Sequence, residues 1–223
     1  MVFPRTVTAI LLAATAALAG GENLTAPAVA TGRLDARLEW GAFDRRLAAD
    51  AIFAETNRAR RLLGLPEFEP SAAADQAAEI QASTNAMLGR IAHDNPLAGL
   101  ATALDRAERA GVRAESVGEN LALSSVLNWR GTSPAYRDEP GGTRRIVDLN
   151  TGGDIPNHTY ASFAEDVVRQ WMESPGHRAN IVNPRFVQLG CAVWPTRGAS
   201  RAELLVSAQL FVQPARVRQR PKP

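Results

Sequence analysis

The residues with the most evident chemistry are histidines, because the 223-residue chain contains only three of them. His93 follows a helical segment in the run Ile91–Asn95, and His177 lies about three residues into a short helix. Near a helix N-terminus, free backbone N–H groups and the positive end of the dipole disfavour imidazolium. We therefore expect a neutral His177 ring that can bind a metal or accept a proton. Taken alone, each histidine, His158 included, is more often structural.

A carboxylate with a suggestive setting is Glu119, in the tripeptide Gly118-Glu119-Asn120. Glu119 lies just before the apolar segment Leu121–Leu123, and Gly118 allows another part of the chain to approach the backbone closely. The same three residues recur at positions 21–23, where a chance match is the obvious explanation. Only the context of Glu119 makes it a candidate site residue.

Ser174 could pair with His177 as a nucleophile, but their spacing is the ordinary one across a helical turn. No oxyanion motif accompanies the pair. Ser174 is explained more simply as the N-cap of a short helix that has Pro175 in its first position and ends at Asn183-Pro184. Nucleophilic catalysis by Ser174 is therefore a minor hypothesis.

The elements that position these residues follow from hydrophobic periodicity and from capping residues. Four helical segments are expected before the short one at residue 174: from Phe43 to near Gly64, from the N-cap Ser71 to about Gly89, from Thr102 to Ala110 with Gly111 as a left-handed cap, and after the capping-box sequence Ser162–Glu165. Two antiparallel strands are expected at residues 187–194 and 203–212. Residues 125–159 indicate a long loop with a short strand at 145–149.

The faces of the first two helices are also predicted. Leu47, Ala51, Ile52 and Ala54 should face the core, with Arg58, Arg60 and Arg61 outside. In the second helix, the inner side should hold Ala74, Ala77, Ala78, Ile80 and Met87.

Residues 1–19 have a positive start at Arg5, an apolar run, and a small-residue ending at Ala17–Ala19, which is typical of a secretory signal peptide. Residues 20–42 indicate an N-terminal extension, and residues 214–223 a basic tail. No later segment is apolar enough to span a membrane. The single Cys191 cannot form an internal disulfide, and its apolar surroundings predict a buried, unreactive thiol.

Composition excludes some classes of protein. With 45% hydrophobic and 22% charged residues, the chain is neither disordered, collagen-like nor a coiled coil. The formal net charge of +2 is small for a nucleic-acid binder, so no nucleic-acid partner is expected.

Several motifs in a fixed order resemble the bacterial branch of the CAP superfamily, which also holds cysteine-rich secretory proteins, antigen 5 and plant pathogenesis-related class 1 proteins. The motifs are Glu55–Arg60, Gly64-Leu65, His93, Gly118–Asn120, Trp171–Ile181, Leu189–Ala192 and Gln209–Phe211. The resemblance covers about residues 45–213 and implies an SCP domain at 43–213 with an insert at 125–159.

The resemblance implies an α+β fold, a three-layer α-β-α sandwich with a small, mainly antiparallel sheet. It also implies a cleft lined by two histidines and one or two acids, which His93, Glu119 and His177 match. Many animal and plant relatives have a second glutamate three residues after the helix tryptophan. Here that position is Ser174, and the acid, Glu173, comes one residue earlier, which turns a helical side chain by about 100°. The disulfides of the eukaryotic relatives are absent.

Three functional hypotheses follow. The favoured one is a non-enzymatic exported module, periplasmic or secreted, that recognises a lipid, a small molecule, or a cell-envelope or host protein through this cleft. The second is a peptidase-like hydrolase in which His93 and His177 hold zinc or a similar divalent ion and Glu119 acts as general base. The third is a structural envelope protein with a vestigial cleft.

Overall fold

The computed structural model describes residues 31–142, 144–198 and 202–215. The predicted signal peptide, residues 20–30 of the extension and residues 216–223 of the tail lie outside them. A four-stranded sheet forms the centre of the molecule, in the order β1-β5-β6-β2. Its strands are β1 (Glu69–Pro70), β2 (Ala114–Ser125), β5 (Gln188–Arg197) and β6 (Glu203–Pro214). Strand β1 runs parallel to β5, and the other neighbours are antiparallel.

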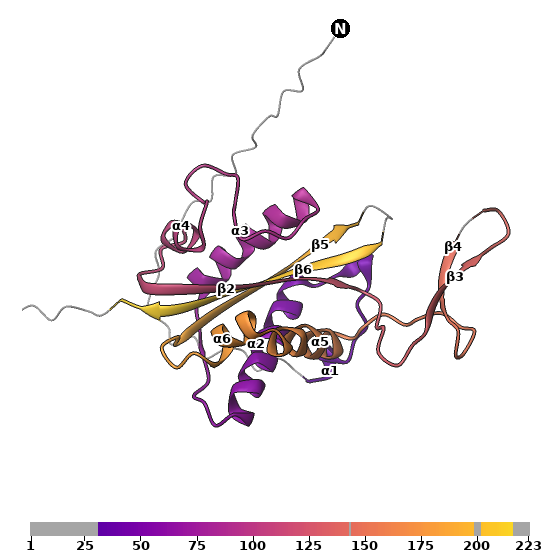
Figure 1. Ribbon diagram of the computed structural model, residues 1–223, viewed down its shortest axis with the longest axis horizontal. Coiled ribbons are helices and arrows are strands. Elements are labelled where there is room, and N and C mark those ends of the chain that lie inside the picture. The colour runs from indigo at the N-terminus through magenta and orange to yellow at the C-terminus, as the bar shows by residue number, and fades with distance from the viewer. Residues whose placement is uncertain (1–30, 143, 199–201, 216–223) are drawn as a thin grey trace, which may run out of the picture.

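Helices cover both faces of this sheet (Figure 1). One layer holds α2 (Arg45–Leu62), α5 (Tyr160–Glu173) and α6 (Pro175–Val182), and the other holds α3 (Ala72–Leu88) and α4 (Ala103–Arg109). Alternation along β6 supplies both cores: Phe211 packs with Ile52 and Trp171 in the first, and Leu210 packs with Ala78 in the second. The predicted α-β-α sandwich is confirmed.

The segment before α2 already belongs to this packing. Residues Thr31–Leu34 form the short helix α1, and Trp40–Ala42 form the 3₁₀ turn η1. Between them, Leu38 is fully buried in the same core as Trp171. Leu38, which lies in the segment predicted as an N-terminal extension, therefore contributes to the core.

Helix α2 begins after the N-cap Asp44, whose carboxylate accepts a hydrogen bond from the Leu47 N–H. Leu47, Ala51 and Ile52 are buried as predicted, but Ala54 is exposed. Arg60 was predicted outside and is only 2% exposed. Its guanidinium is buried because it donates to the carbonyls of Pro66, Ile181 and Asn183 and stacks on Phe68.

Helix α3 has the predicted ends, the N-cap Ser71 and Gly89 with a φ of 62°. Its buried face differs from the prediction, because Met87 is 74% exposed and Ile80 is half-buried. The polar residues Gln81 and Asn85 continue the buried stripe instead. Both side chains donate to the Ala92 carbonyl, so hydrogen bonding makes their burial possible.

Helix α5 starts earlier than the predicted capping box at Ser162–Glu165. The N-cap is Thr159, whose hydroxyl accepts from the Ser162 N–H while the Ser162 hydroxyl accepts from the Thr159 N–H. Glu165 instead lies on the surface near Arg130. Helix α6 has Ser174 as N-cap and Pro175 in its first turn as predicted, although the Ser174 side chain makes no capping hydrogen bond.

Strands β5 and β6 confirm the predicted antiparallel pair. The short strand predicted within the insert is β4 (Arg144–Asp148), and it pairs with an unexpected strand, β3 (Pro134–Asp138). This hairpin projects away from the sandwich (Figure 1). Helix α4 ends at Arg109 with Ala110 as its C-cap, and the predicted left-handed glycine, Gly111, follows with a φ of 85°.

Candidate functional site

The candidate site lies at strand β2, one of the two edge strands of the sheet in the described residues. Successive side chains of a strand point to opposite faces, so Glu119 and Asn120 reach different helical layers. Glu119 contacts Arg106 of α4, whereas Asn120 contacts the backbone of α6. The site therefore combines groups from both sides of the sheet.

The Glu119 carboxylate is bound on both of its oxygens. Oε1 lies 2.8 Å from Nδ1 of His93, and Oε2 lies 2.5 Å from an Nη atom of Arg106. The side chains of Glu119 and Arg106 are 5% and 0% exposed, whereas that of His93 is 62% exposed. When Nδ1 of His93 carries the proton, it donates to Glu119 and leaves Nε2 as a free acceptor. The carboxylate thus orients an imidazole that remains accessible.

Arg106 is the site residue that sequence reasoning missed. Its other Nη atom donates to the carbonyls of Leu100 and Ala101, at 3.0 and 3.3 Å. These bonds hold the guanidinium next to Glu119. In the described residues, Nε of Arg106 has no hydrogen-bond partner. An electrostatic argument could have identified it, because a buried carboxylate needs a nearby cation. Arg106 lies on α4 next to the small, buried residue Ala107.

His177 is half-buried in the first turn of α6. Burial lowers the pKa of its imidazole, and the nearby charge of His93 lowers that pKa further. The His177 carbonyl accepts a hydrogen bond from Nδ2 of Asn120 at 3.2 Å. Nδ2 of Asn180, one turn further along α6, donates to the Glu119 carbonyl at 3.2 Å and to Oδ1 of Asn120 at 2.9 Å. The two asparagines fix α6, and with it His177, against β2.

Gly118 is required where α6 approaches β2. A Cβ atom on this residue would lie 2.7 Å from Oδ1 of Asn180 and 2.9 Å from the ring of Phe186. Both contacts are shorter than van der Waals packing allows. The close approach predicted at Gly118 is confirmed.

The remaining predicted residues lie differently. Glu173 binds Arg169 at 2.9 Å and its side chain is 63% exposed on α5, so its described contacts do not involve His93, Glu119 or His177. Ser174 is half-buried, and no hydrogen bond from its hydroxyl to His177 is found among the described residues. His158 is 3% exposed and bonds Ser162 at the start of α5, which is a structural position.

The donor set does not fit a metal site in which Glu119 is a ligand. Catalytic zinc needs about three protein ligands, and both Glu119 oxygens are already bound. Arg106, a buried cation, would also lie 2.5 Å from one of those oxygens and repel the ion. In the ranges that the structure describes, no three His, Cys, Asp or Glu side chains form a metal-binding group. Only the two imidazoles remain as candidate ligands.

A model of the cysteine-rich secretory protein family, CAP, matches residues 53–211. This match covers more than half of the chain, and the protein belongs to the CAP family, as its motifs predicted. No curated protein matches the chain.

The chain is similar in structure to three solved bacterial proteins, all at low sequence identity. An outer surface protein of Borrelia burgdorferi is 15% identical, with a TM-score of 0.51, over 78% of this chain and 97% of that one. An extracellular protein containing an SCP domain from Bacillus anthracis is 20% identical, with a TM-score of 0.49, over 76% of this chain and 41% of that one. A cysteine-rich secretory protein from Staphylococcus aureus is 15% identical, with a TM-score of 0.42, over 76% and 39%. This chain thus spans less than half of the latter two proteins.

Across the described ranges, none of the helices combines the length and the apolar character that a membrane span requires.

Proposed function

We propose that the protein is an exported, non-enzymatic binding module whose cleft at strand β2 recognises a ligand through the imidazoles of His93 and His177. Its ligand is a lipid, a small molecule, or a cell-envelope or host protein. Membership of the CAP family and the extracellular or outer-surface origin of its structural neighbours support export.

The observation that carries this proposal is the engagement of Glu119 on both oxygens. A general base needs a free lone pair directed at the proton that it removes. Each Glu119 oxygen keeps a second lone pair, but the side chain is only 5% exposed, so a substrate proton or a water molecule has little access to it. In contrast, the exposed ring of His93 is held in one orientation, which suits recognition by a hydrogen bond.

The hydrolase hypothesis is weaker for the same reason. A divalent ion would be held by His93 and His177 alone, and Glu119, which is 5% exposed and paired with Arg106, would have little access to a water molecule that it could activate. The hypothesis of a vestigial cleft differs from both, because it predicts no ligand at all.

The test is binding to the full chain and to a His93→Ala, His177→Ala variant, with Asp94→Asn as a control beside His93. Zinc is titrated by calorimetry, and vesicles of phosphatidylethanolamine and phosphatidylglycerol are tested by sedimentation. We expect a cleft ligand to lose at least tenfold in affinity in the double variant while the melting temperature stays constant. Equal binding by wild type and double variant would contradict recognition through the histidines. Stoichiometric zinc that disappears in the double variant would favour the hydrolase hypothesis.

A further inference from the structure

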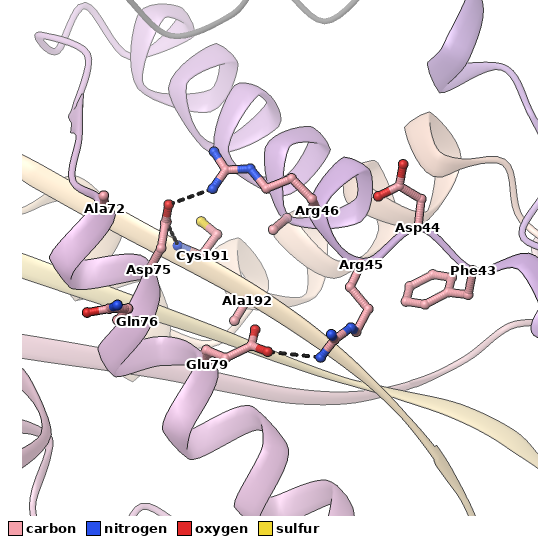
Figure 2. A pocket seen from close by; sticks show the side chains of 11 residues that line it. Phe43, Asp44, Arg45, Arg46, Ala72, Asp75, Gln76, Glu79, Cys191 and Ala192 are labelled. Carbon is pink, nitrogen blue, oxygen red and sulfur yellow. Dashed lines mark hydrogen bonds and ion pairs between the residues drawn. The ribbon is translucent and has the colours of Figure 1, made fainter. Parts of the chain in front are cut away.

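A cavity of about 610 Å³ lies over β5, between the first turns of α2 and α3 (Figure 2). Two ion pairs cross it, Arg45 to Glu79 and Arg46 to Asp75, each at 2.9 Å. Asp44, the third carboxylate of its lining, is also paired with an arginine. Every lining carboxylate is therefore matched, and this cavity selects no charged ligand. The most deeply buried polar groups lie elsewhere, in the two layers that carry His93 and His177.

Six of these buried polar residues form two hydrogen-bonded networks, and each residue is at most 4% exposed. They are Thr56, Asn120 and Gln209 in one network and Gln81, Thr84 and Asn95 in the other. Burying an amide is unfavourable unless protein partners replace the hydrogen bonds that it makes with water. The partners of these side chains therefore show which parts of the structure the networks hold in place.

The first network links α2 to α6 across the sheet. The Thr56 hydroxyl accepts a hydrogen bond from Nε2 of Gln209 at 2.8 Å, and Oε1 of Gln209 accepts one from Nδ2 of Asn120 at 3.1 Å. Nδ2 of Asn120 also donates to the His177 carbonyl, so both of its protons are used. Rotating the Asn120 amide would break a bond at one end or the other. Gln209 thus fixes the orientation of the group that binds the backbone of His177.

The second network ties the loop after α3 to that helix. Nε2 of Gln81 donates to the Ala92 carbonyl, and Oε1 of Gln81 accepts from Nδ2 of Asn95 at 3.0 Å. Nδ2 of Asn95 also donates to the Thr84 hydroxyl at 3.1 Å. Ala92 directly precedes His93, and Asn95 follows it two residues later. Gln81 therefore holds the loop on both sides of His93.

The two networks come together at Glu119. Nδ2 of Asn180, which donates to Asn120 of the first network, also donates to the Glu119 carbonyl. The Glu119 carboxylate binds the His93 ring, whose backbone the second network holds. The two imidazoles are also coupled, because burial and then the charge of His93 lower the pKa of His177. Each histidine is thus supported from a different layer, and both supports end beside the same carboxylate.

We propose that Gln209 and Gln81 are positioning residues of the cleft at β2: Gln209 sets the position of His177, and Gln81 sets that of His93. Each acts through the backbone that carries the histidine and not through the imidazole itself. Groups that contact a ligand are held more precisely when packed, hydrogen-bonded residues support them from behind. This inference rests on the proposed function, because it takes the two histidines as the groups that contact the ligand.

The histidine rings themselves report their positions. The chain contains three histidines, so the ¹H–¹³C NMR spectrum of their ring Cε1–Hε1 groups has three signals, which are assigned by replacing each histidine in turn. Spectra of the full chain are recorded at about pH 8, above the ordinary pKa of histidine, so that protonation does not move the signals.

We expect Gln209→Met to move the His177 signal further than the His93 signal, and Gln81→Met to do the reverse. The His158 signal should stay in place in both variants. Methionine resembles glutamine in length and flexibility, so each substitution removes hydrogen bonds while it keeps the core filled. If neither variant moves a histidine signal, or if both move the same histidine most, the proposal is overturned.

Ile52→Val separates positioning from a general loosening of the core. Ile52 is fully buried one turn before Thr56 on α2, and the substitution removes a methyl group but no side-chain hydrogen bond. We expect it to lower the melting temperature and to leave the His177 signal in place. A shift as large as that in Gln209→Met would refute the assignment. If Gln209→Met does not fold, Thr56→Val replaces it, because it removes the acceptor of the Gln209 amide and should move the same signal.

The outcome for positioning can be told apart from the outcome for ligand binding. The spectra are recorded without ligand, whereas the proposed function is tested with zinc and vesicles. The expected shifts, together with equal binding by wild type and the His93→Ala, His177→Ala variant, would refute recognition through the histidines and support the two positioning roles. Unmoved signals, together with binding that the double variant loses, would support recognition and refute the roles of Gln209 and Gln81.

Discussion

Replacing Arg106 with Met tests the electrostatic arrangement of the candidate cleft. The substitution keeps an apolar stem but removes a guanidinium that is fully buried and 2.5 Å from Glu119. It also frees the carbonyls of Leu100 and Ala101. Removing one partner of a buried pair leaves the other charge uncompensated, which costs about 3–5 kcal/mol. Both side chains are at most 5% exposed, so solvent screening gives little relief and we expect a loss of about 4 kcal/mol.

A double-mutant cycle separates the charge from the lost packing. Adding Glu119→Gln to Arg106→Met removes the stranded charge, and we expect it to restore about 1–2 kcal/mol. Urea unfolding at pH 7, followed by tryptophan fluorescence, to which the buried Trp171 contributes, measures each free energy of unfolding. Arg109→Met, an exposed position on the same helix, should change stability by less than about 0.5 kcal/mol. A loss below about 1 kcal/mol for Arg106→Met, or no recovery in the double variant, would refute the reasoning.

Three other predictions concern local contacts. Thr159→Ala removes the capping box of α5 and should lower the free energy of unfolding in urea by about 1 kcal/mol. Ser174→Ala loses no capping hydrogen bond and should lower it by less than about 0.5 kcal/mol, and equal losses would contradict this. Gly190→Ala would place Cβ 2.1 Å from the backbone of Ala74, so we expect a loss of about 3 kcal/mol or more, and an unchanged thermal unfolding curve would show that α3 can move away. Burial lowers the pKa of His158, so its contribution to stability is present above about pH 6.5 and decreases as pH falls towards the folded-state pKa. His158→Gln should therefore reduce the pH dependence of the free energy of unfolding in urea between about pH 5 and 7. An unchanged slope would contradict this.

The parts of the fold that could be predicted from sequence are those set by short-range chemistry. Helix ends are set by residues within a turn of them. The Ser71 hydroxyl caps the start of α3, the left-handed Gly89 ends it, and Pro175 occupies the first turn of α6. The apolar run before Trp194 is buried on both faces of β5, so it predicts a strand without knowledge of its neighbours. The same surroundings bury Cys191 and raise the pKa of its thiol, as expected.

Buried polar residues could not be placed in this way. Arg60 has the residue type and spacing of an exposed position, and its burial depends on acceptors outside the helix: the Pro66 carbonyl and the distant carbonyls of Ile181 and Asn183. Gln81 likewise belongs inside because the loop after α3 brings the Ala92 carbonyl to it. Local patterns do not contain these partners, so Arg60 was predicted outside and Gln81 was not included in the predicted inner face of α3.

Strand β2 was missed for a related reason, and that reason also explains how the candidate site is arranged. The side chain of Glu119 faces one helical layer and that of Asn120 faces the other, and each contacts polar groups there. The segment therefore shows no alternation of apolar and polar residues. Histidines from opposite layers can come together only where the sheet ends. A further strand on β2 would compete for the Glu119 carbonyl, which already accepts from Asn180 of α6. The Asn180 side chain therefore occupies a backbone acceptor of this edge strand and also holds the helix that carries His177.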